Sequence, residues 1–359
     1  MINYIPIKKI ELKALEGIEK IRPFFHRINI SFYDISFNDL KNEYKDKIAV
    51  YNYNVNDVQK VTNKRYRSKG MFELDTGNKV NIIFNNNDKY LPSVIASITH
   101  PTHDDLYELE DKLCNKIRSS RHVVSSVECT VDFMCKNDEQ SRVGDLFYIF
   151  CRNYYAANAK RTQFFGGKYY GYASERDYKK EREGGNAVYA VHFSEKNRSE
   201  SKRVKFYERG PDEAMRKNRK YWRYSACDRV RFEVTVKRTF LKNILITTIN
   251  DVLRRPILYP VLFDECRPLF QFKRFIDKNY REYRPPVPDG RYNQNQLEAC
   301  KCECFMEQVF WAKEKGLNIA QCLEDYDRFG KLVEMTKEAI ALYEKEFIKN
   351  PIVIEIIEP

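Results

Sequence analysis

The sequence has 359 residues, enough for two domains with hydrophobic cores. It carries 63 Lys and Arg against 51 Asp and Glu, and the resulting net charge of +12 favours a polyanionic partner such as nucleic acid. No apolar stretch resembles a signal peptide or a membrane span, so we expect a cytoplasmic protein rather than a secreted or membrane-spanning one. We therefore expect the ten cysteines to be reduced thiols, including Cys300, Cys302 and Cys304 in a predicted helix.

The first third of the chain predicts a mainly β structure. Residues 1–22 look like a charged helical arm. Strands are predicted by alternation of apolar and polar residues in four segments: 26–33, 71–74, 79–84 and 93–99. Residues 75–78, with the sequence Asp-Thr-Gly-Asn, indicate a hairpin turn between the second and third of these strands. Thr102 is a candidate N-cap for an amphipathic helix over 103–117.

The middle of the chain contains a strand candidate with three carboxyl or hydroxyl side chains on one face. In 127–133, Glu128, Thr130 and Asp132 alternate with apolar residues, which places them on the same side of a strand. A helix is predicted over 144–159, an irregular basic loop over 160–185 and a further strand over 187–193.

Two more alternating stretches share this design. In 202–210, Lys205 and Tyr207 lie on one face together with Arg203 and Arg209, and we expect that face to be exposed. In 230–236, Arg231, Glu233 and Thr235 share a face in the same way. If the three strands are neighbours, two or three carboxylates meet a tyrosine on one polar surface of a sheet.

Such a surface suits cleavage of a phosphodiester. Tyr207 is the candidate nucleophile, and Lys205 would favour its phenolate form. Glu128, Asp132 and Glu233 are candidate ligands for Mg²⁺ or Mn²⁺, because hard carboxylate oxygens suit these ions. The same pattern is also compatible with simple surface ion pairs around an ordinary strand tyrosine. The strongest basic run is 196–223, and Arg231 adds a cation on the third strand candidate. The candidate DNA-binding residues are Lys202, Arg203, Arg209, Arg216, Lys217, Arg219, Lys220 and Arg231.

The last third of the chain predicts helices. One helix is expected over 239–255, and three more over 297–315, 319–326 and 329–348. A proline-rich segment over 280–296 separates the first of these helices from the other three and is predicted to be a linker. The expected organisation is therefore an arm (1–22), a catalytic domain (23–279), a linker (280–296) and a helical C-terminal domain (297–359).

Three sequence blocks resemble the replication-initiating nicking endonucleases of filamentous phages and, more loosely, plasmid rolling-circle initiators. They are Ser-Ser-Val-Glu-Cys-Thr-Val-Asp-Phe (125–133), Arg-Val-Lys-Phe-Tyr-Glu-Arg-Gly (203–210) and Val-Arg-Phe-Glu-Val-Thr-Val-Lys-Arg-Thr-Phe-Leu-Lys (230–242). The second block resembles the one that carries the family's nucleophilic tyrosine, which assigns that role to Tyr207. In the first block the family has Arg-Ile-Asp where this chain has Ser126-Val127-Glu128.

The resemblance implies an α+β fold, an antiparallel-rich sheet with helices on one face and DNA on the other, followed by a small all-helical C-terminal module. It implies site-specific nicking of an origin through a 5′-phosphotyrosine, with strand transfer, in the cytoplasm of a bacterial host. The partners would be double-stranded origin DNA, its exposed single strand, a polymerase and a separate helicase, because the chain has no Walker-type phosphate loop. A non-catalytic DNA-binding regulator derived from such an initiator is the alternative.

Two further features bear on the type of enzyme. No two histidines lie two residues apart, so a histidine-only metal site on one strand is not expected, and His100 and His103 read as loop surface. Tyr189 is the second candidate for a nucleophile, but it lacks neighbouring cations.

Overall fold

The protein is described here by a computed structural model that covers residues 17–52, 66–86, 90–117, 121–135, 161–165, 190–194, 202–209, 229–262 and 319–349. Ten strands lie in these ranges: β1 (Ile18–Phe32), β2 (Ile48–Asn52), β3 (Tyr66–Glu73), β4 (Lys79–Asn86), β5 (Val94–Thr99), β6 (His122–Cys135), β7 (Arg161–Phe165), β8 (Ala190–Ser194), β9 (Lys202–Glu208) and β10 (Arg229–Lys237). They form one sheet in the order β2-β3-β4-β5-β1-β6-β10-β9-β8-β7. All the described pairings are antiparallel, which confirms the predicted α+β class.

The two longest strands, β1 and β6, hold the sheet together. They pair along almost their whole lengths, and β1 also pairs with β5 over residues 27–32. Strand β1 begins at Ile18, so part of the segment predicted to be a helical arm is instead the start of the central strand. Alternation of apolar residues explains this pairing, because each strand then offers one apolar face to a shared core.

Helices cover one face of the sheet. They are α2 (Phe37–Tyr44), α4 (His103–Leu109) with its π-helical continuation η2 (Glu110–Lys116), α8 (Arg238–Asn243), α9 (Ile249–Arg254), α10 (Leu258–Leu262) and α12 (Ile319–Phe347). A short 3₁₀ turn, η1 (Lys45–Lys47), follows α2. The apolar side chains of these helices and of the strands form one continuous core. The predicted arrangement of helices on one face is therefore confirmed.

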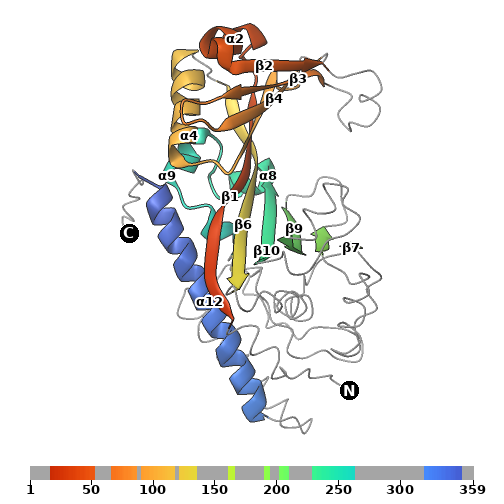
Figure 1. The fold of residues 1–359 in the computed structure, drawn as a ribbon, viewed down its shortest axis with the longest axis vertical. Helices are drawn as coiled ribbons and strands as arrows, with labels where there is room; N and C mark the ends of the chain where they lie inside the picture. Colours follow the sequence, from red (N-terminus) through yellow and green to blue (C-terminus); the bar gives the residue numbers. More distant parts are fainter. Residues whose placement is uncertain are drawn as a thin grey trace.

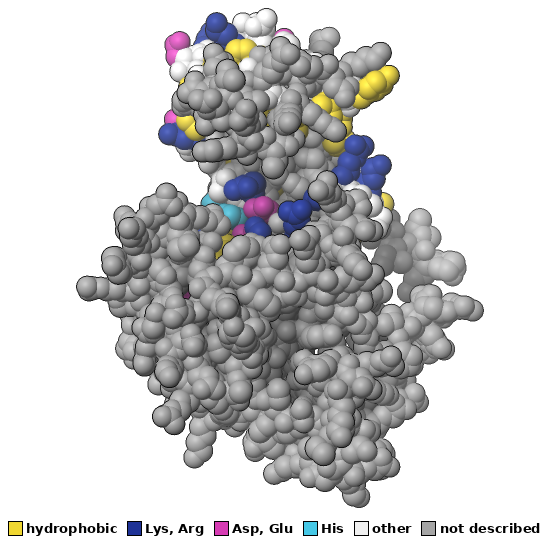
Figure 2. Space-filling view, turned by 90° about the vertical axis from the view of Figure 1, so that its right-hand side faces the viewer, with side chains coloured by type: hydrophobic (Ala, Val, Ile, Leu, Met, Phe, Trp, Pro, Cys, Tyr) yellow, Lys and Arg dark blue, Asp and Glu magenta, His cyan; other side chains and the backbone are white. Residues whose placement is uncertain are grey.

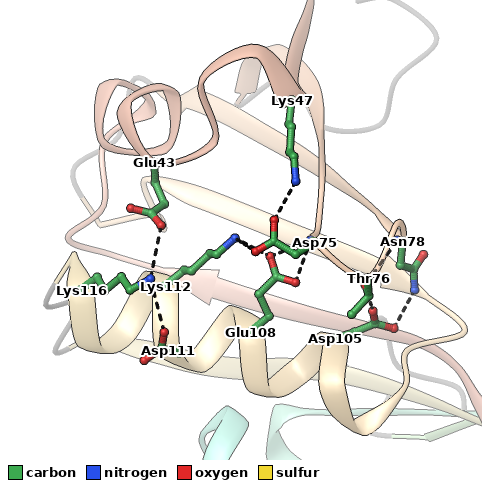
Figure 3. A network of polar contacts seen from close by, with 10 residues as sticks. All are labelled: Glu43, Lys47, Asp75, Thr76, Asn78, Asp105, Glu108, Asp111, Lys112 and Lys116. Carbon is green, nitrogen blue, oxygen red and sulfur yellow. Dashed lines mark hydrogen bonds and ion pairs between the residues drawn. The ribbon is translucent and has the colours of Figure 1, made fainter.

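The hairpin between β3 and β4 is locked onto α4 (Figure 3). Its turn contains Gly77 with φ +85°, a conformation that glycine adopts without strain. Asp105, the third residue of α4, completes a capping box with Thr102 and also accepts hydrogen bonds from Thr76 and Asn78. The amide of Asp75 donates to both carboxylate oxygens of Glu108, at 3.0 and 2.9 Å. The predicted hairpin turn and the predicted N-cap of α4 are therefore connected by the same hydrogen-bonded residues.

Two predicted helices differ from the structure. The helix expected over 239–255 is broken into α8 and α9, because Leu245 has φ +59° and Thr248 starts a new helix by a capping box with Asp251. Conversely, the helices expected over 319–326 and 329–348 are one continuous helix, α12, since residues 327 and 328 are compatible with helix.

Helix α12 packs along β1 on the apolar face (Figure 1). The amide of Phe25 in β1 donates to the hydroxyl of Tyr343 at 3.3 Å, and the Phe25 ring contacts Phe347. One carboxylate oxygen of Glu344 accepts the amides of Ile257 and Leu258 at 2.7 Å each. The end of the chain therefore supports the central strand directly.

Several predictions lie outside the described residues. These are the helix over 144–159, most of the loop over 160–185, Tyr189, the linker over 280–296 and the helix over 297–315 with its cysteines 300, 302 and 304. Of the cysteines that are described, Cys114, Cys129 and Cys135 are not in disulfide bonds. Within the described ranges, every helix is too short or too polar to cross a membrane.

Candidate functional site

The three alternating stretches are neighbouring strands, in the order β6, β10, β9. Glu233 of β10 lies opposite Thr130 of β6 on one side and opposite Lys205 of β9 on the other. Arg231 lies between Asp132 and Tyr207 in the same way. Directly opposed residues project from the same face of a sheet, so the polar residues of all three strands share one face.

This polar face is largely buried at its centre, not exposed as predicted. The side chains of Tyr207, Glu233 and Asp132 belong to residues that are 2%, 1% and 1% exposed. Alternation shows which residues share a face, but not what covers that face. Buried polar and charged side chains require hydrogen-bond partners, and each of these three residues has one.

A fourth strand adds a residue that the sequence did not reveal, His26 of β1. Strand β1 pairs Phe25 with Cys129 and Arg27 with Glu128, so His26 is the extra residue of a β-bulge. The bulge allows Phe25 and Ile28 to face the core although they are three residues apart. Strict alternation from Ile28 would place His26 in the core, whereas the bulge brings it beside Glu128.

His26, Glu128 and Glu233 form one compact cluster. The Nδ1 atom of His26 lies 3.2 Å from Oε2 of Glu128 and 3.1 Å from Oε2 of Glu233. These contacts place one nitrogen and two oxygens within metal-ligand reach of one another. Burial alone would lower the pKa of His26, but hydrogen bonding and the charges of both glutamates raise it above its ordinary value.

The cluster fits a divalent ion. Nδ1 of His26 is buried and lies close to two carboxylates, although this nitrogen can carry only one proton to share between them. Ligands about 2.1 Å from an ion and at right angles to each other are about 3.0 Å apart, close to the two distances observed. Asp132, predicted as a third carboxylate ligand, is not in this group among the described residues.

Tyr207 and Lys205 both contact Glu233. The hydroxyl of Tyr207 donates to Oε2 at 3.0 Å, and Nζ of Lys205 forms an ion pair with Oε1. Burial alone would raise the pKa of Glu233, but its hydrogen bond with His26 and the charge of Lys205 outweigh burial and lower the pKa far below its ordinary value. Glu233 is therefore ionised and links the proposed nucleophile to the cluster.

Asp132 and Arg231 instead pair with each other. Nε and Nη2 of Arg231 donate to the two oxygens of Asp132 at 2.6 and 2.7 Å, and the two side chains are 4% and 1% exposed. Burial works to lower the pKa of Arg231, but Asp132 and Tyr207 together raise it. The guanidinium also lies 5.1 Å from the centre of the Phe24 ring. Arg231, predicted to bind DNA, thus has a buried partner.

Other cations surround the cluster on the same face. Arg203 of β9 is exposed and Arg209 is half-buried. Strand β1 adds Arg22 and Arg27, which the sequence did not single out and which lie opposite Asp132 and Glu128. The view onto the side of the molecule away from α12 shows basic, acidic and histidine side chains gathered in one region (Figure 2).

Five predicted DNA-binding side chains cannot be placed. Lys202 belongs to β9, but its side chain is not described. The remaining four lie outside the described residues: Arg216, Lys217, Arg219 and Lys220.

His100 lies at the rim of the cluster. It follows β5, is exposed as predicted, and has φ +51°, which is unusual for a residue other than glycine. Its ring stacks on Phe24 and meets the ring of His26 edge-on, with centroid distances of 5.1 Å in both cases. Partial burial and the positive charges of His26 and nearby arginines lower its pKa to about 4, so His100 is neutral at physiological pH.

No protein-family model matches the sequence, and no curated protein is significantly similar to it. Among solved structures, the chain is similar to a rolling circle replication initiator protein from Geobacillus stearothermophilus. The TM-score is 0.39 and the sequence identity 11%, with 79% of this chain and 96% of the other covered. A likeness at this level carries no argument about the fold or function of this chain.

Proposed function

We propose that this chain is a DNA-nicking and strand-transfer enzyme that initiates rolling-circle replication of a phage, plasmid or related mobile element. The observation that carries the proposal is the hydrogen bond from the Tyr207 hydroxyl to Glu233, because Glu233 also belongs to the cluster with His26 and Glu128. A nucleophile beside a site for a divalent ion, on a face with several cations, has the parts that covalent phosphodiester cleavage needs. The sequence resemblance of the three strand blocks to phage nicking enzymes supports the same activity.

His26, Glu128 and Glu233 would hold the ion, which would supply positive charge to polarise the phosphoryl oxygens. Without an ion, the two glutamates face Lys205, Arg27 and His26, whose pKa burial alone would lower but the two carboxylates raise. A divalent ion in place of a proton on His26 adds one positive charge, which favours a DNA phosphate. The imidazole ligand favours Mn²⁺ over Mg²⁺, because Mg²⁺ prefers oxygen ligands alone.

Tyr207 would attack the scissile phosphorus. The bond from its hydroxyl oxygen to phosphorus forms as the bond to the 3′-oxygen breaks, which leaves a 5′-phosphotyrosine and a free 3′-hydroxyl. The phenol proton leaves along the hydrogen bond to Glu233 toward solvent, and the departing 3′-oxygen takes up one proton from solvent, so that the step balances. Lys205 lies within reach of the same carboxylate and stabilises the negative charge that develops. The reverse reaction transfers or rejoins the strand.

The partners follow from these products. The enzyme would bind double-stranded origin DNA and its exposed single strand, with Arg22, Arg27 and Arg203 contacting phosphates near the cluster. The free 3′-hydroxyl would prime a polymerase, and a separate helicase would open the duplex.

The alternative function, a DNA-binding regulator without catalysis, is favoured by one observation. Tyr207 is only 2% exposed, so a phosphate reaches its hydroxyl only if the surroundings of the site open. In a regulator, Tyr207 and Glu233 would form a buried structural hydrogen bond and nothing more.

The test is nicking of supercoiled DNA that carries the native origin, in the presence of Mn²⁺. The wild-type protein should produce open circles with protein covalently attached, and Tyr207→Phe should form no adduct while still binding the DNA. Tyr259→Phe, a half-exposed tyrosine on α10, is the matched control and should cut normally. Adduct formation by Tyr207→Phe would overturn the assignment of the nucleophile, and the absence of nicking by the wild type would favour the regulator.

The role of the ion is tested separately. Glu128→Gln keeps the shape of the side chain but removes its charge, so it should weaken Mn²⁺ binding by about 10-fold or more, as measured by calorimetry. Cutting by the wild type in excess chelator would show that the cluster is a structural ion-pair network.

A further inference from the structure

A second group of possible metal ligands lies on the other face of β6. Cys114 Sγ is 3.4 Å from Nδ1 and 3.8 Å from Nε2 of His122, and Oε2 of Glu110 is 3.7 Å from Nε2 of the same ring. One ligand atom of each residue lies within 4.8 Å of the others. His122 is six residues from Glu128 along β6, about 20 Å at the rise of an extended strand, so this group is separate from the cluster at His26.

Regular secondary structure positions all three side chains. Glu110 and Cys114 are four residues apart in η2, so they project from the same side of the helix. η2 is π-helical, a geometry that occurs mostly in single turns and frequently at functional sites. His122 is the first residue of β6, and its ring packs against Phe32 at 5.9 Å, which fixes its position on the apolar face.

Without an ion, the polar atoms of this group are not all hydrogen-bonded. Oε2 of Glu110 is buried and accepts no hydrogen bond. The amide of Ile249, at the start of α9, approaches Nε2 of His122 at 3.4 Å, a long contact. A carboxylate, a thiol and an imidazole therefore converge here, and one buried carboxylate oxygen of the group lacks a hydrogen bond, which is an arrangement suited to ligands of a cation.

The distances suit a tetrahedral ion. With bonds of about 2.3 Å to sulfur and about 2.1 Å to nitrogen and oxygen, a zinc site places S and N about 3.6 Å apart, and N and O about 3.4 Å apart. The observed separations of 3.8 and 3.7 Å are longer by only a few tenths of an ångström. A thiolate ligand selects zinc-class ions over Mg²⁺ and Mn²⁺.

We propose that Glu110, Cys114 and His122 form a second metal site, which binds one zinc-class divalent ion through a carboxylate, a thiolate and an imidazole, with water as the fourth ligand. Binding displaces the thiol proton of Cys114 to solvent and forms the metal–sulfur bond, with no change of oxidation state. The ion would join η2 to β6 beside the start of α9 and so stabilise the packing of three elements. This site does not depend on the proposed nicking activity, and its test uses no DNA.

The experiment is a titration of the full-length, reduced and metal-stripped protein with Co²⁺, which reports a thiolate ligand by an intense near-ultraviolet charge-transfer band. The titration is made in a Glu128→Gln background, which weakens the cluster at His26. We expect the band to appear at one Co²⁺ per chain and Zn²⁺ to abolish it by displacement. Cys114→Ser should remove the band and weaken zinc binding by about 100-fold or more. Cys135→Ser, which changes a buried cysteine outside the group, is the matched control and should keep the band.

Two results would overturn the proposal: no band in the parent protein, or a band that persists in Cys114→Ser. If Cys114→Ser does not fold, as judged by circular dichroism, Glu110→Gln and His122→Gln provide the answer. Each removes one ligand with little change of shape and should weaken Zn²⁺ binding by about 10-fold or more, as well as reduce the rise in melting temperature that Zn²⁺ produces. Unchanged zinc affinity in both variants rejects the site.

Discussion

The substitution Asp132→Asn tests whether Asp132 acts as a metal ligand or as an ion-pair partner. The position of Asp132 on β6 predicts a metal ligand, whereas the structure pairs it with Arg231. Asp132→Asn separates the two roles, because it keeps the shape of the side chain and removes only its charge. If Asp132 is a metal ligand, the variant protein should bind the ion less tightly. If Asp132 is an ion-pair partner, the variant should have a lower free energy of unfolding.

The size of the stability loss follows from the geometry of the pair. Two hydrogen bonds of 2.6 and 2.7 Å join the charged groups, and neither side chain is more than 4% exposed, so water cannot replace the lost carboxylate. Two unit charges 4 Å apart at an effective dielectric constant of 20 attract each other by about 4 kcal/mol. Removal of one partner from a buried pair typically costs about 3–5 kcal/mol. We expect about 3 kcal/mol, because the Asn oxygen still accepts one hydrogen bond from Arg231.

Urea unfolding followed by far-ultraviolet circular dichroism measures this loss, and calorimetry measures Mn²⁺ binding by the same variant. Asp132→Asn should be destabilised with unchanged Mn²⁺ affinity, and Glu128→Gln should show the opposite profile. An Asp132→Asn protein of wild-type stability that no longer binds Mn²⁺ would refute the reasoning and restore Asp132 as a ligand.

Three further predictions concern DNA binding, acid stability and the C-terminal helix. Arg203→Ala should reduce the slope of log affinity for DNA against log salt by about 1, whereas Arg254→Ala, on the helix-covered face, should leave it unchanged; equal effects would contradict the proposed DNA face. Burial tends to raise the pKa of Asp105, but its hydrogen bonds lower it overall. Its stabilising contribution is therefore present above pH about 4 and lost as the pH falls below that value, so Asp105→Asn should flatten the acid limb of a stability–pH curve. Glu344→Ala should cost about 1–3 kcal/mol in urea unfolding, because buried amides lose their acceptor, and exposed Glu346→Ala should cost little.

Local patterns in the sequence predicted much of the fold. Alternation identified the strands that carry Glu128, Tyr207 and Glu233, and these strands are neighbours as expected. The hairpin and the Thr102 cap were predictable because a few adjacent residues decide such features. The break between α8 and α9 was missed although Thr248 and Asp251 form a local capping box there.

The candidate site was predictable only in part, because its remaining features depend on contacts between distant residues. His26 was missed since the bulge that turns it toward Glu128 is set by pairing between β1 and β6. The only trace in the sequence is the three-residue spacing of Phe25 and Ile28, which breaks the alternation. The pairing of Asp132 with Arg231 likewise depends on strand register, which the sequence of a single strand does not specify.

The contact between α12 and β1 limits how this protein can be divided or recombined. The Phe25 amide that donates to Tyr343 belongs to the residue immediately before His26, so the last helix supports the bulge from behind. A hybrid that joined residues 1–262 to the helical segment of a distant relative would have to preserve this contact to keep His26 in place. The C-terminal helix therefore cannot be exchanged freely between relatives, and substitutions at positions 25 and 343 should occur together.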